Sequence, residues 1–435
     1  MLDELRLAAR RQRGSRDLRA LVRGCKQLLS DRGEMGGMPV ALEVIERLFD
    51  LDEDWLDAFF AYLGEDLNPD PAAVLRAAQA YQQQPDPVRL AALTVAAEPP
   101  RQELLRRLNR AAGGTAAVLR LRRALLERLP RHPELAGIEA DLLHLLSSWF
   151  NPGFLQMKRV DWQSPAQLLE KIIHHEAVHQ IDGWDDLRRR LQPDRRLFAF
   201  FHPALPDEPL IFVEVALLPE MPDAIGPLID KRSTPLEPDR FRVAAFYSIS
   251  NCEPGLRGVS LGNFLIKSVA LQLKRELPRL KTFCTLSPIP RLAAWLLSNP
   301  DLRALPGLGK GRGDALEAAR ERLLKRCEGD LSALQAASVH ERLDDDDRRA
   351  LMALGAACLA LVSPTPKGDP VARFHLDNGA RLERLNLRGN PSPRGLKQSF
   401  GLMVNYLYDL DSIEAHHARF RSGEVVRSRA VAALL

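Results

Sequence analysis

Residues 241–286 read FRVAAFYSISNCEPGLRGVSLGNFLIKSVALQLKRELPRLKTFCTL. This stretch gives the clearest prediction of local structure in the chain. Phe241–Ser250 is rich in aromatic and apolar side chains and predicts a strand, and Thr282–Leu286 predicts a second strand. Between them, a turn at Leu256–Gly262 precedes a helix that Pro278 ends. The helix is indicated by apolar residues at helical spacing, namely Ile266, Val269, Ala270, Leu273 and Leu277. The predicted unit is strand, glycine turn, helix and strand.

The glycine turn is the first candidate for ligand binding. A turn that opens a helix exposes backbone N–H groups at the positive end of the helix dipole, which is a natural seat for a phosphate. Its pattern, Arg-Gly-x-Ser-x-Gly, is similar to the pyrophosphate loop Arg/Gln-x-x-Gly-x-Gly/Ala of the GCN5-related acyltransferase fold, which holds coenzyme A. Ser260 stands where that loop has its middle glycine. The alternative is a turn that joins strand to helix and binds nothing.

Composition excludes several classes of protein. The chain has 435 residues and a net charge of +4, which is too balanced to require a nucleic-acid or membrane partner. Its longest apolar run, Leu351–Val362, has 12 residues, whereas a membrane span needs about 20. No N-terminal segment resembles a secretory signal, and the chain does not end in a Ser-Lys-Leu address. The cysteines are scattered and form no CxxC pair: Cys25, Cys252, Cys284, Cys327 and Cys358. We therefore expect a bacterial cytoplasmic protein without a structural zinc site.

The pattern of helices and strands predicts an α+β protein with two domains. Residues 1–150 are expected to form an all-helical bundle with a structural or oligomerising role, in which Asp70-Pro71 and Asp86-Pro87 each begin a helix. Residues 151–435 are expected to form a mixed-sheet domain with a helical insertion at about 301–362. Its further strands or extended segments are predicted at 197–201, 210–218, 373–376, 382–387 and 401–408, and Ser287–Pro290 is expected to be irregular.

One motif suggests a different chemistry. His175-Glu176-Ala177-Val178-His179 fits H-E-x-x-H, in which two histidines one helical turn apart bind zinc beside a glutamate base. A plausible helix precedes it, but Asp182-Gly183 follows within four residues and no further ligand is evident. We favour a helix end here, and we expect no metal site.

Four separated stretches of the chain together resemble malonyl-CoA decarboxylase. They occur in the family's order, and they are His202–Leu210, Ser248–Gly262, Leu286–Pro290, and Phe374–Ala380 with Gly401–Tyr406. The resemblance covers residues 150–435 strongly and the N-terminal part by architecture only. It implies an oligomerising helical domain followed by a catalytic domain of the GCN5-related acyltransferase fold. It also implies conversion of malonyl-CoA to acetyl-CoA and CO2 without a metal or organic cofactor.

The resemblance also carries over site residues. Ser287 and His375 match the catalytic pair, Ser248 and Tyr406 match positions near the family's active site, and Asn405 is expected to hydrogen-bond the substrate. Loss of CO2 leaves an enolate, which needs hydrogen-bond donors and then a proton at its α-carbon. We expect Ser287 to orient the carboxylate and His375 to act as the acid, although Ser287 could instead be a nucleophile that His375 activates. A helix-capping serine and a histidine beside a turn are the structural alternatives.

Coenzyme A binding is expected at the glycine turn and on the strand before it. The residues carried over are Ser248, Arg257, Gly258, Val259, Ser260, Gly262 and Asn263; the family's animal members have a glutamate where Ser260 stands. The expected partners are malonyl-CoA or acetyl-CoA and further copies of the chain, as a dimer or tetramer. Two other functions remain open: a CoA-dependent N-acyltransferase of the same fold, and a non-catalytic acyl-CoA-binding scaffold protein.

Overall fold

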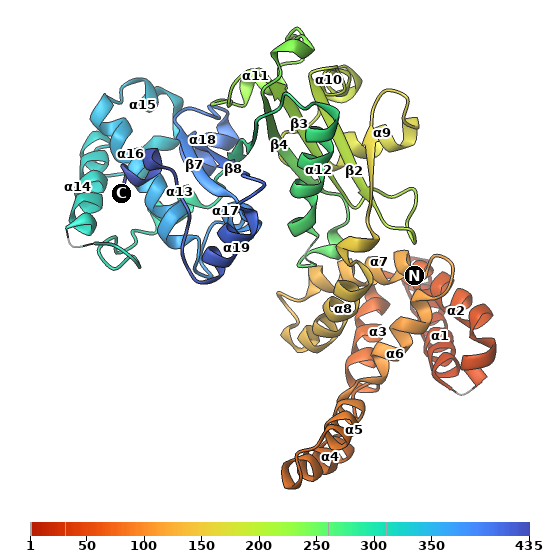
Figure 1. Cartoon of the computed structure of the whole chain (residues 1–435). Helices are drawn as coiled ribbons and strands as arrows, with labels where there is room; N and C mark the ends of the chain where they lie inside the picture. Colours follow the sequence, from red (N-terminus) through yellow and green to blue (C-terminus); the bar gives the residue numbers. More distant parts are fainter. Residues whose placement is uncertain (1, 31, 260, 310) are drawn as a thin grey trace. The chain divides into compact units, whose positions relative to one another are not determined.

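The computed structural model describes residues 2–30, 32–259, 261–309 and 311–435 (Figure 1). It divides into two compact units. The first unit comprises Met1–Gln156 and two short segments from elsewhere in the chain, Phe201–Glu208 and Glu253–Ser260. The second unit comprises Met157–Phe200, Pro209–Cys252 and Leu261–Leu435. The sequence boundary was expected at residue 150, and the two added segments are loops of the strand-rich region that pack with the helices.

The first unit is helical, as predicted. Its α-helices are α1 (Leu2–Leu29), α2 (Arg32–Asp50), α3 (Glu53–Glu65), α4 (Pro71–Gln83), α5 (Pro87–Ala97), α6 (Pro100–Asn109), α7 (Gly114–Arg128) and α8 (Ala136–Trp149). The two Asp-Pro pairs begin α4 and α5, where the carboxylates of Asp70 and Asp86 accept hydrogen bonds from the first-turn amides of Ala72 and Arg89. Helices α4 and α5 contact each other and have no buried residue, in contrast to α3 and α6–α8.

The second unit is built on one mixed sheet. Its strands are β1 (Gln156–Val160), β2 (Arg195–Phe201), β3 (Ile211–Leu218), β4 (Val243–Asn251), β5 (Thr282–Thr285), β6 (Ser287–Pro288), β7 (Arg381–Asn386) and β8 (Met403–Leu407). Within the described residues, the order is β1-β2-β3-β4-β5-β8-β6, with β7 paired to β8. Strands β4 and β5 are parallel, whereas the β2–β3, β3–β4 and β8 pairings are antiparallel. The α+β prediction is confirmed.

Two local predictions were wrong. Residues 287 and 288 were expected to be irregular but form β6, because Ser287 and Pro288 pair with Val404 and Met403 of β8. Residues 373–376 were expected to be extended but lie in helix α17 (Pro370–Asp377). Asp369 caps that helix by accepting hydrogen bonds from Val371 N and Ala372 N, both 3.0 Å.

Strands β4 and β5 separate part-way along β4. They pair from Val243 with Thr282 to Phe246 with Thr285, and the Leu286 amide donates to Phe246 O at 3.0 Å. Beyond this point β4 continues to Asn251 beside β3, while the chain after β5 pairs with β8. After Phe246, β4 therefore has only β3 as a neighbouring strand in the described sheet, an arrangement in which an extended ligand can lie along the strand.

The remaining described α-helices belong to the second unit. They are α9 (Ala166–His175), α10 (Gly183–Arg190), α11 (Gly226–Ile229), α12 (Gly262–Glu276), α13 (Leu292–Leu297), α14 (Arg312–Arg326), α15 (Ala337–Glu341), α16 (Asp345–Ala357), α17, α18 (Pro393–Ser399), α19 (Ile413–Arg421) and α20 (Arg429–Ala432). Helix α12 is the helix predicted after the glycine turn, and Ile266, Val269, Ala270 and Leu273 on it are buried. Among the described helices, none combines the length and the apolar character that a membrane-spanning segment needs.

Candidate active site

Ser287 and His375 form a direct hydrogen bond inside the second unit. The Oγ atom of Ser287 lies 3.0 Å from Nε2 of His375. Ser287 is positioned by β6, and His375 lies on α17, so the β6–β8 pairing and the packing of this helix bring the two side chains together. Both are almost completely buried, with exposed fractions of 5% and 4%. The predicted catalytic pair is therefore a physical pair in a site that excludes water.

Two tyrosines contact the imidazole, and Thr285 contacts Ser287. The hydroxyl of Tyr408 lies 2.9 Å from Nδ1 of His375, and the ring of Tyr406 stacks on the imidazole with centroids 4.7 Å apart. Ser287 Oγ also donates to Oγ1 of Thr285 at 2.9 Å. These bonds are mutually consistent when Nε2 carries the proton and donates to Ser287, while Nδ1 accepts from Tyr408. The hydroxyl of Tyr406 is buried and has no hydrogen-bond partner among the described residues.

Burial controls the charge of this group. It lowers the pKa of His375 to about 3, because no described anion faces the ring and the charged form would be desolvated. Burial also raises the pKa of the Tyr406 and Tyr408 hydroxyls well above the usual tyrosine value. The site therefore consists of neutral hydrogen-bond donors. Such donors can stabilise an oxyanion without first losing their own protons.

Asn405 lies beside this group but turns its amide elsewhere. Its Nδ2 donates to Thr285 O at 2.8 Å and to Pro222 O at 3.0 Å. Its Oδ1 accepts from Arg384 Nε at 3.1 Å and from Asn386 Nδ2 at 2.8 Å. An amide can make about four such bonds. Asn405 therefore holds the main chain of Thr285 in place, and its side-chain amide has no N–H left to donate to a ligand.

The part of the glycine turn before Leu261 belongs to the first unit, where a buried arginine holds it. Arg122 of α7 donates to Gly255 O at 2.5 Å and to Arg257 O at 2.7 Å. Its guanidinium also pairs with the Glu139 carboxylate at 2.7 and 3.0 Å. Gly258 has φ +86°, a left-handed conformation that favours glycine. Val259 is buried, Ser260 lies outside the described residues, and Gly262 and Asn263 begin α12.

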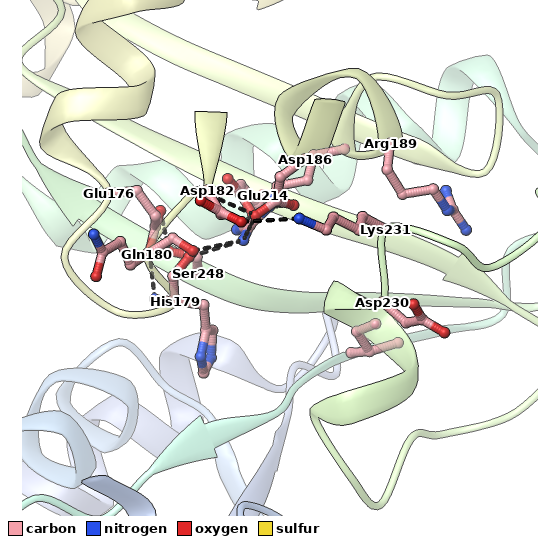
Figure 2. A network of polar contacts seen from close by, with 12 residues as sticks. Glu176, His179, Gln180, Asp182, Asp186, Arg189, Glu214, Asp230, Lys231 and Ser248 are labelled. Atoms are coloured by element: carbon pink, nitrogen blue, oxygen red, sulfur yellow. Dashed lines mark hydrogen bonds and ion pairs between the residues drawn. The ribbon is translucent and has the colours of Figure 1, made fainter. Parts of the chain in front are cut away.

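Ser248 lies in a different cluster, around Glu176 (Figure 2). Its Oγ donates to the Glu176 carboxylate, with both oxygens 2.7 Å away. Glu176 belongs to the H-E-x-x-H motif, but helix α9 ends at His175 and Glu176 is already extended. The two histidines are therefore not on one helical face, which the zinc arrangement requires. Burial lowers the pKa of His179 to about 3, so this imidazole is neutral near pH 7.

The comparisons with known proteins agree with these motifs. Residues 67–150 match the model of the malonyl-CoA decarboxylase N-terminal domain, and residues 153–435 match that of the malonyl-CoA decarboxylase C-terminal domain. This chain belongs to the malonyl-CoA decarboxylase family. The second match alone includes Ser248, Ser287, His375, Asn405 and Tyr406.

Solved structures and curated relatives of the family support the assignment. The malonyl-CoA decarboxylase from Rhodopseudomonas palustris is 46% identical with a TM-score of 0.83, covering 94% of this chain and 98% of that chain. The one from Agrobacterium vitis is 45% identical with a TM-score of 0.83, covering 95% and 99%. Mitochondrial malonyl-CoA decarboxylase of Mus musculus is 37% identical over 331 residues, or 71% of this chain. That of Anser anser anser is 36% identical over 343 residues, or 73% of this chain. The chain spans 65% of the length of both curated relatives.

The structure thus divides five of the predicted site residues of this family member into three groups, apart from those of the glycine turn. Ser287, His375 and Tyr406 are together. Asn405 is adjacent but saturated by protein groups, and Ser248 is tied to Glu176. The residues that sequence reasoning missed are Thr285, Tyr408, Arg122 and Glu176. Thr285 lies two residues before Ser287, and Tyr408 lies two residues after Tyr406. Alternate side chains of an extended chain share a face, so this period could have indicated both residues. Nothing in the sequence pointed to Arg122, which lies 133 residues from Gly255.

Proposed function

We propose that this chain decarboxylates malonyl-CoA to acetyl-CoA and CO2 at the group formed by Ser287, His375 and Tyr406. The observation that carries the proposal is the buried 3.0 Å contact between Ser287 and His375, beside a tyrosine hydroxyl without a protein partner. Membership of the family supports the substrate. A water-excluded site with neutral donors fits a reaction whose charge moves from a carboxylate to a thioester oxygen.

The bond changes follow from the chemistry of a malonyl thioester. The electron pair of the bond between the α-carbon and the carboxylate moves into the thioester, which releases CO2 and leaves an enolate. In our proposal, the Ser287 hydroxyl gives up its bond to Thr285 when substrate binds and donates its proton to the carboxylate, which orients this group so that the bond can break into the thioester π-system. The free hydroxyl of Tyr406 donates to the thioester oxygen as it gains charge. A proton must then reach the α-carbon.

We assign that proton to His375. Burial keeps its imidazole neutral in the free protein, but a substrate carboxylate is an anion that favours the protonated form and counteracts burial. The proton taken up with the substrate then moves to the α-carbon, which leaves the imidazole neutral again. Because Nε2 in the free site donates to Ser287, it is not placed as a base that would activate this serine. We therefore favour Ser287 as a hydrogen-bond donor over Ser287 as a nucleophile.

We propose that two elements, each considered by itself, bind coenzyme A. Left-handed Gly258 presents the backbone closely, and the start of α12 offers N–H groups to a pyrophosphate. Along residues 247–250, where β4 has only β3 as a neighbouring strand in the described sheet, an extended pantetheine arm can lie against the strand. Coenzyme A enters as part of the substrate, and we propose no other cofactor.

We further infer a cytoplasmic bacterial enzyme that forms a homo-oligomer through its helical unit. All described cysteines are free and buried, which fits a reducing compartment. Helices α4 and α5 expose large apolar side chains that a monomer would leave in water: Leu75, Val88, Leu90 and Val95. A second copy that covers them would remove this cost.

The test is incubation of the purified chain with malonyl-CoA alone, without an amine acceptor, while acetyl-CoA and CO2 are followed. We expect equal amounts of both products. Succinyl-CoA is the control, because its carboxylate is one carbon farther from the thioester and its loss would not give an enolate. An N-acyltransferase would release CoA only after an amine is added, and a scaffold would bind malonyl-CoA without turnover. Either result would overturn the proposal.

A further inference from the structure

Glu176 has every hydrogen-bonding site of its carboxylate occupied. Oε1 accepts from Val178 N at 2.8 Å and from His179 N at 2.7 Å, while Ser248 and Ser250 donate their hydroxyl protons, Ser250 to Oε2 at 3.0 Å. A carboxylate has about four lone-pair sites, and these are four donors. Glu176 is buried, as are both serines. A carboxylate held by four donors in this way is a fixed element of the fold.

The loop that follows Glu176 is anchored from several sides. The amide of Ala177 donates to Ser250 Oγ at 3.2 Å, so Ser250 is occupied both as donor and as acceptor. Arg190 Nη2 donates to His179 O at 2.9 Å, and its Nη1 pairs with the buried Glu214 at 2.9 Å. These contacts keep the carboxylate in place when the groups around it change.

The Glu176 carboxylate fixes the direction of the hydrogen bond that Ser248 makes. A serine hydroxyl has one proton and two lone pairs, and the proton of Ser248 is directed at the carboxylate 2.7 Å away. Ser248 therefore offers lone pairs, and not a proton, to any other group. Its one other polar neighbour described is Ser250 Oγ at 3.3 Å, and Ser250 gives its own proton to Glu176. Ser248 thus acts as an acceptor.

Ser248 also lies on the part of β4 that no longer pairs with β5, where a bound ligand with an N–H group would need a hydrogen-bond acceptor. It is the second residue of β4 after Phe246, the last residue of that strand to pair with β5. We propose that Glu176 is a positioning residue, which holds Ser248 as a hydrogen-bond acceptor for an amide N–H of the pantetheine arm of an acyl-CoA. This inference rests on the proposed function for the identity of the ligand. It gives the glutamate of the H-E-x-x-H motif a role in substrate binding without metal.

The test compares variants of Glu176 and Ser248 in the full chain, by calorimetric titration with coenzyme A and by turnover of malonyl-CoA. In Glu176→Gln, the side-chain amide can donate to Ser248, which turns its hydroxyl toward the ligand as a donor. We expect the Kd for coenzyme A and the KM for malonyl-CoA to rise about 3- to 10-fold, the effect of one neutral hydrogen bond, with kcat changed less. Ser248→Ala should give the same rise, and the double variant should be no worse than either single one.

Asp182→Asn is the matched control, because it neutralises a carboxylate on the same loop that is paired with exposed Lys231. It should leave both constants at wild-type values. Ser248→Thr and Ser248→Val keep Glu176 and so remain informative if Glu176→Gln does not fold: threonine retains the hydroxyl, and valine has its shape without it. Equal affinity of these two variants for coenzyme A, or additive losses in the double variant, would overturn the inference. If coenzyme A binds as expected but wild-type protein releases no CO2, the proposed function fails and this inference stands.

Discussion

The Nε2 atom of His375 lies 3.0 Å from Oγ of Ser287, although 88 residues separate them in the chain. The intervening segment contains helices α13 to α16, so the contact depends on how this helical insertion returns the chain to the sheet. Asp369 secures the return, because its carboxylate caps α17 and also accepts from Arg291 N at 2.9 Å, just after β6. The Asp369 side chain thus connects the start of α17, which carries His375, to the chain just after β6, which carries Ser287.

The pair should act as a unit in catalysis. We expect Ser287→Ala and His375→Ala each to reduce kcat by about 10²- to 10⁴-fold, the range of positioned acid–base groups. The double variant should be little worse than the poorer single variant, because both groups serve one step. Affinity for coenzyme A should change little. A folded His375→Ala protein that retains more than about a tenth of wild-type kcat would refute the assignment.

The two tyrosines should respond differently to loss of their hydroxyls. Tyr408→Phe removes the bond to His375 Nδ1, so we expect a loss of about 1 kcal/mol of stability together with reduced kcat. Tyr406→Phe removes a buried hydroxyl without a protein partner, so stability should stay constant or rise while kcat falls about 10-fold or more. Thermal unfolding and steady-state kinetics on both variants measure this contrast. Wild-type kcat in Tyr406→Phe would remove this hydroxyl from the mechanism.

Stability should fall on the acid side of neutrality because of the buried histidines. The pKa of His375 and of His179 is lowered to about 3 in the folded chain, against about 6.5 for a histidine in an unfolded chain. Between these values the unfolded state binds protons that the folded state does not, so stability decreases as pH falls from about 6.5 to about 3. Each histidine contributes up to about 1.4 kcal/mol per pH unit.

The measurement is urea unfolding of wild-type protein and of His375→Gln at several pH values from 7 downward. The variant should show a smaller acid-side slope by up to one proton, whatever its stability at pH 7. Carboxylates titrate in both proteins and cancel in the comparison. Parallel pH profiles would mean that the pKa of His375 is not lowered in the folded chain.

The glycine turn can be tested at Gly258. Its φ of +86° strains any other residue by about 1–2 kcal/mol, but a Cβ would meet Leu143 Cδ1 at 3.7 Å and Arg122 Nη2 at 3.9 Å, which are ordinary contacts. Gly258→Asn and Gly258→Asp therefore cost similar strain and differ by one negative charge. If the turn holds the pyrophosphate, the aspartate should weaken coenzyme A binding at least about 10-fold more than the asparagine. Equal calorimetric affinities would place the phosphates elsewhere.

Metal removal tests the hypothesis that the H-E-x-x-H motif binds zinc. Since helix α9 ends at His175 and the Glu176 carboxylate is saturated, we expect a chelator to leave activity unchanged. Elemental analysis of the purified chain should find no stoichiometric zinc. One zinc per chain, lost together with activity, would contradict the geometry described for this loop.

The first residues of three helices show what can be predicted from local sequence. Asp70-Pro71 and Asp86-Pro87 predicted the first residues of α4 and α5 correctly, because an aspartate cap and a proline in the first turn act within a few residues. The same signal, Asp369-Pro370, begins α17, where an extended segment was predicted instead. The extended segment was predicted from the apolar residues that follow Pro370, although the capping aspartate and the proline before them indicated a helix.

Local sequence was sufficient to predict the strand, turn, helix and strand of residues 241–286, the helical first part of the chain, and the family through its separated motifs. These depend on period, capping and residue identity, which are local properties. Tertiary structure alone decided the rest. Ser287 became part of a strand only because β8 pairs with it, and Glu176 left the helical pattern of its motif because Ser248 and Ser250 satisfy its buried carboxylate. Partners so far away in sequence leave no periodic trace, since a hydrogen bond between side chains requires only that the fold bring them within about 3 Å.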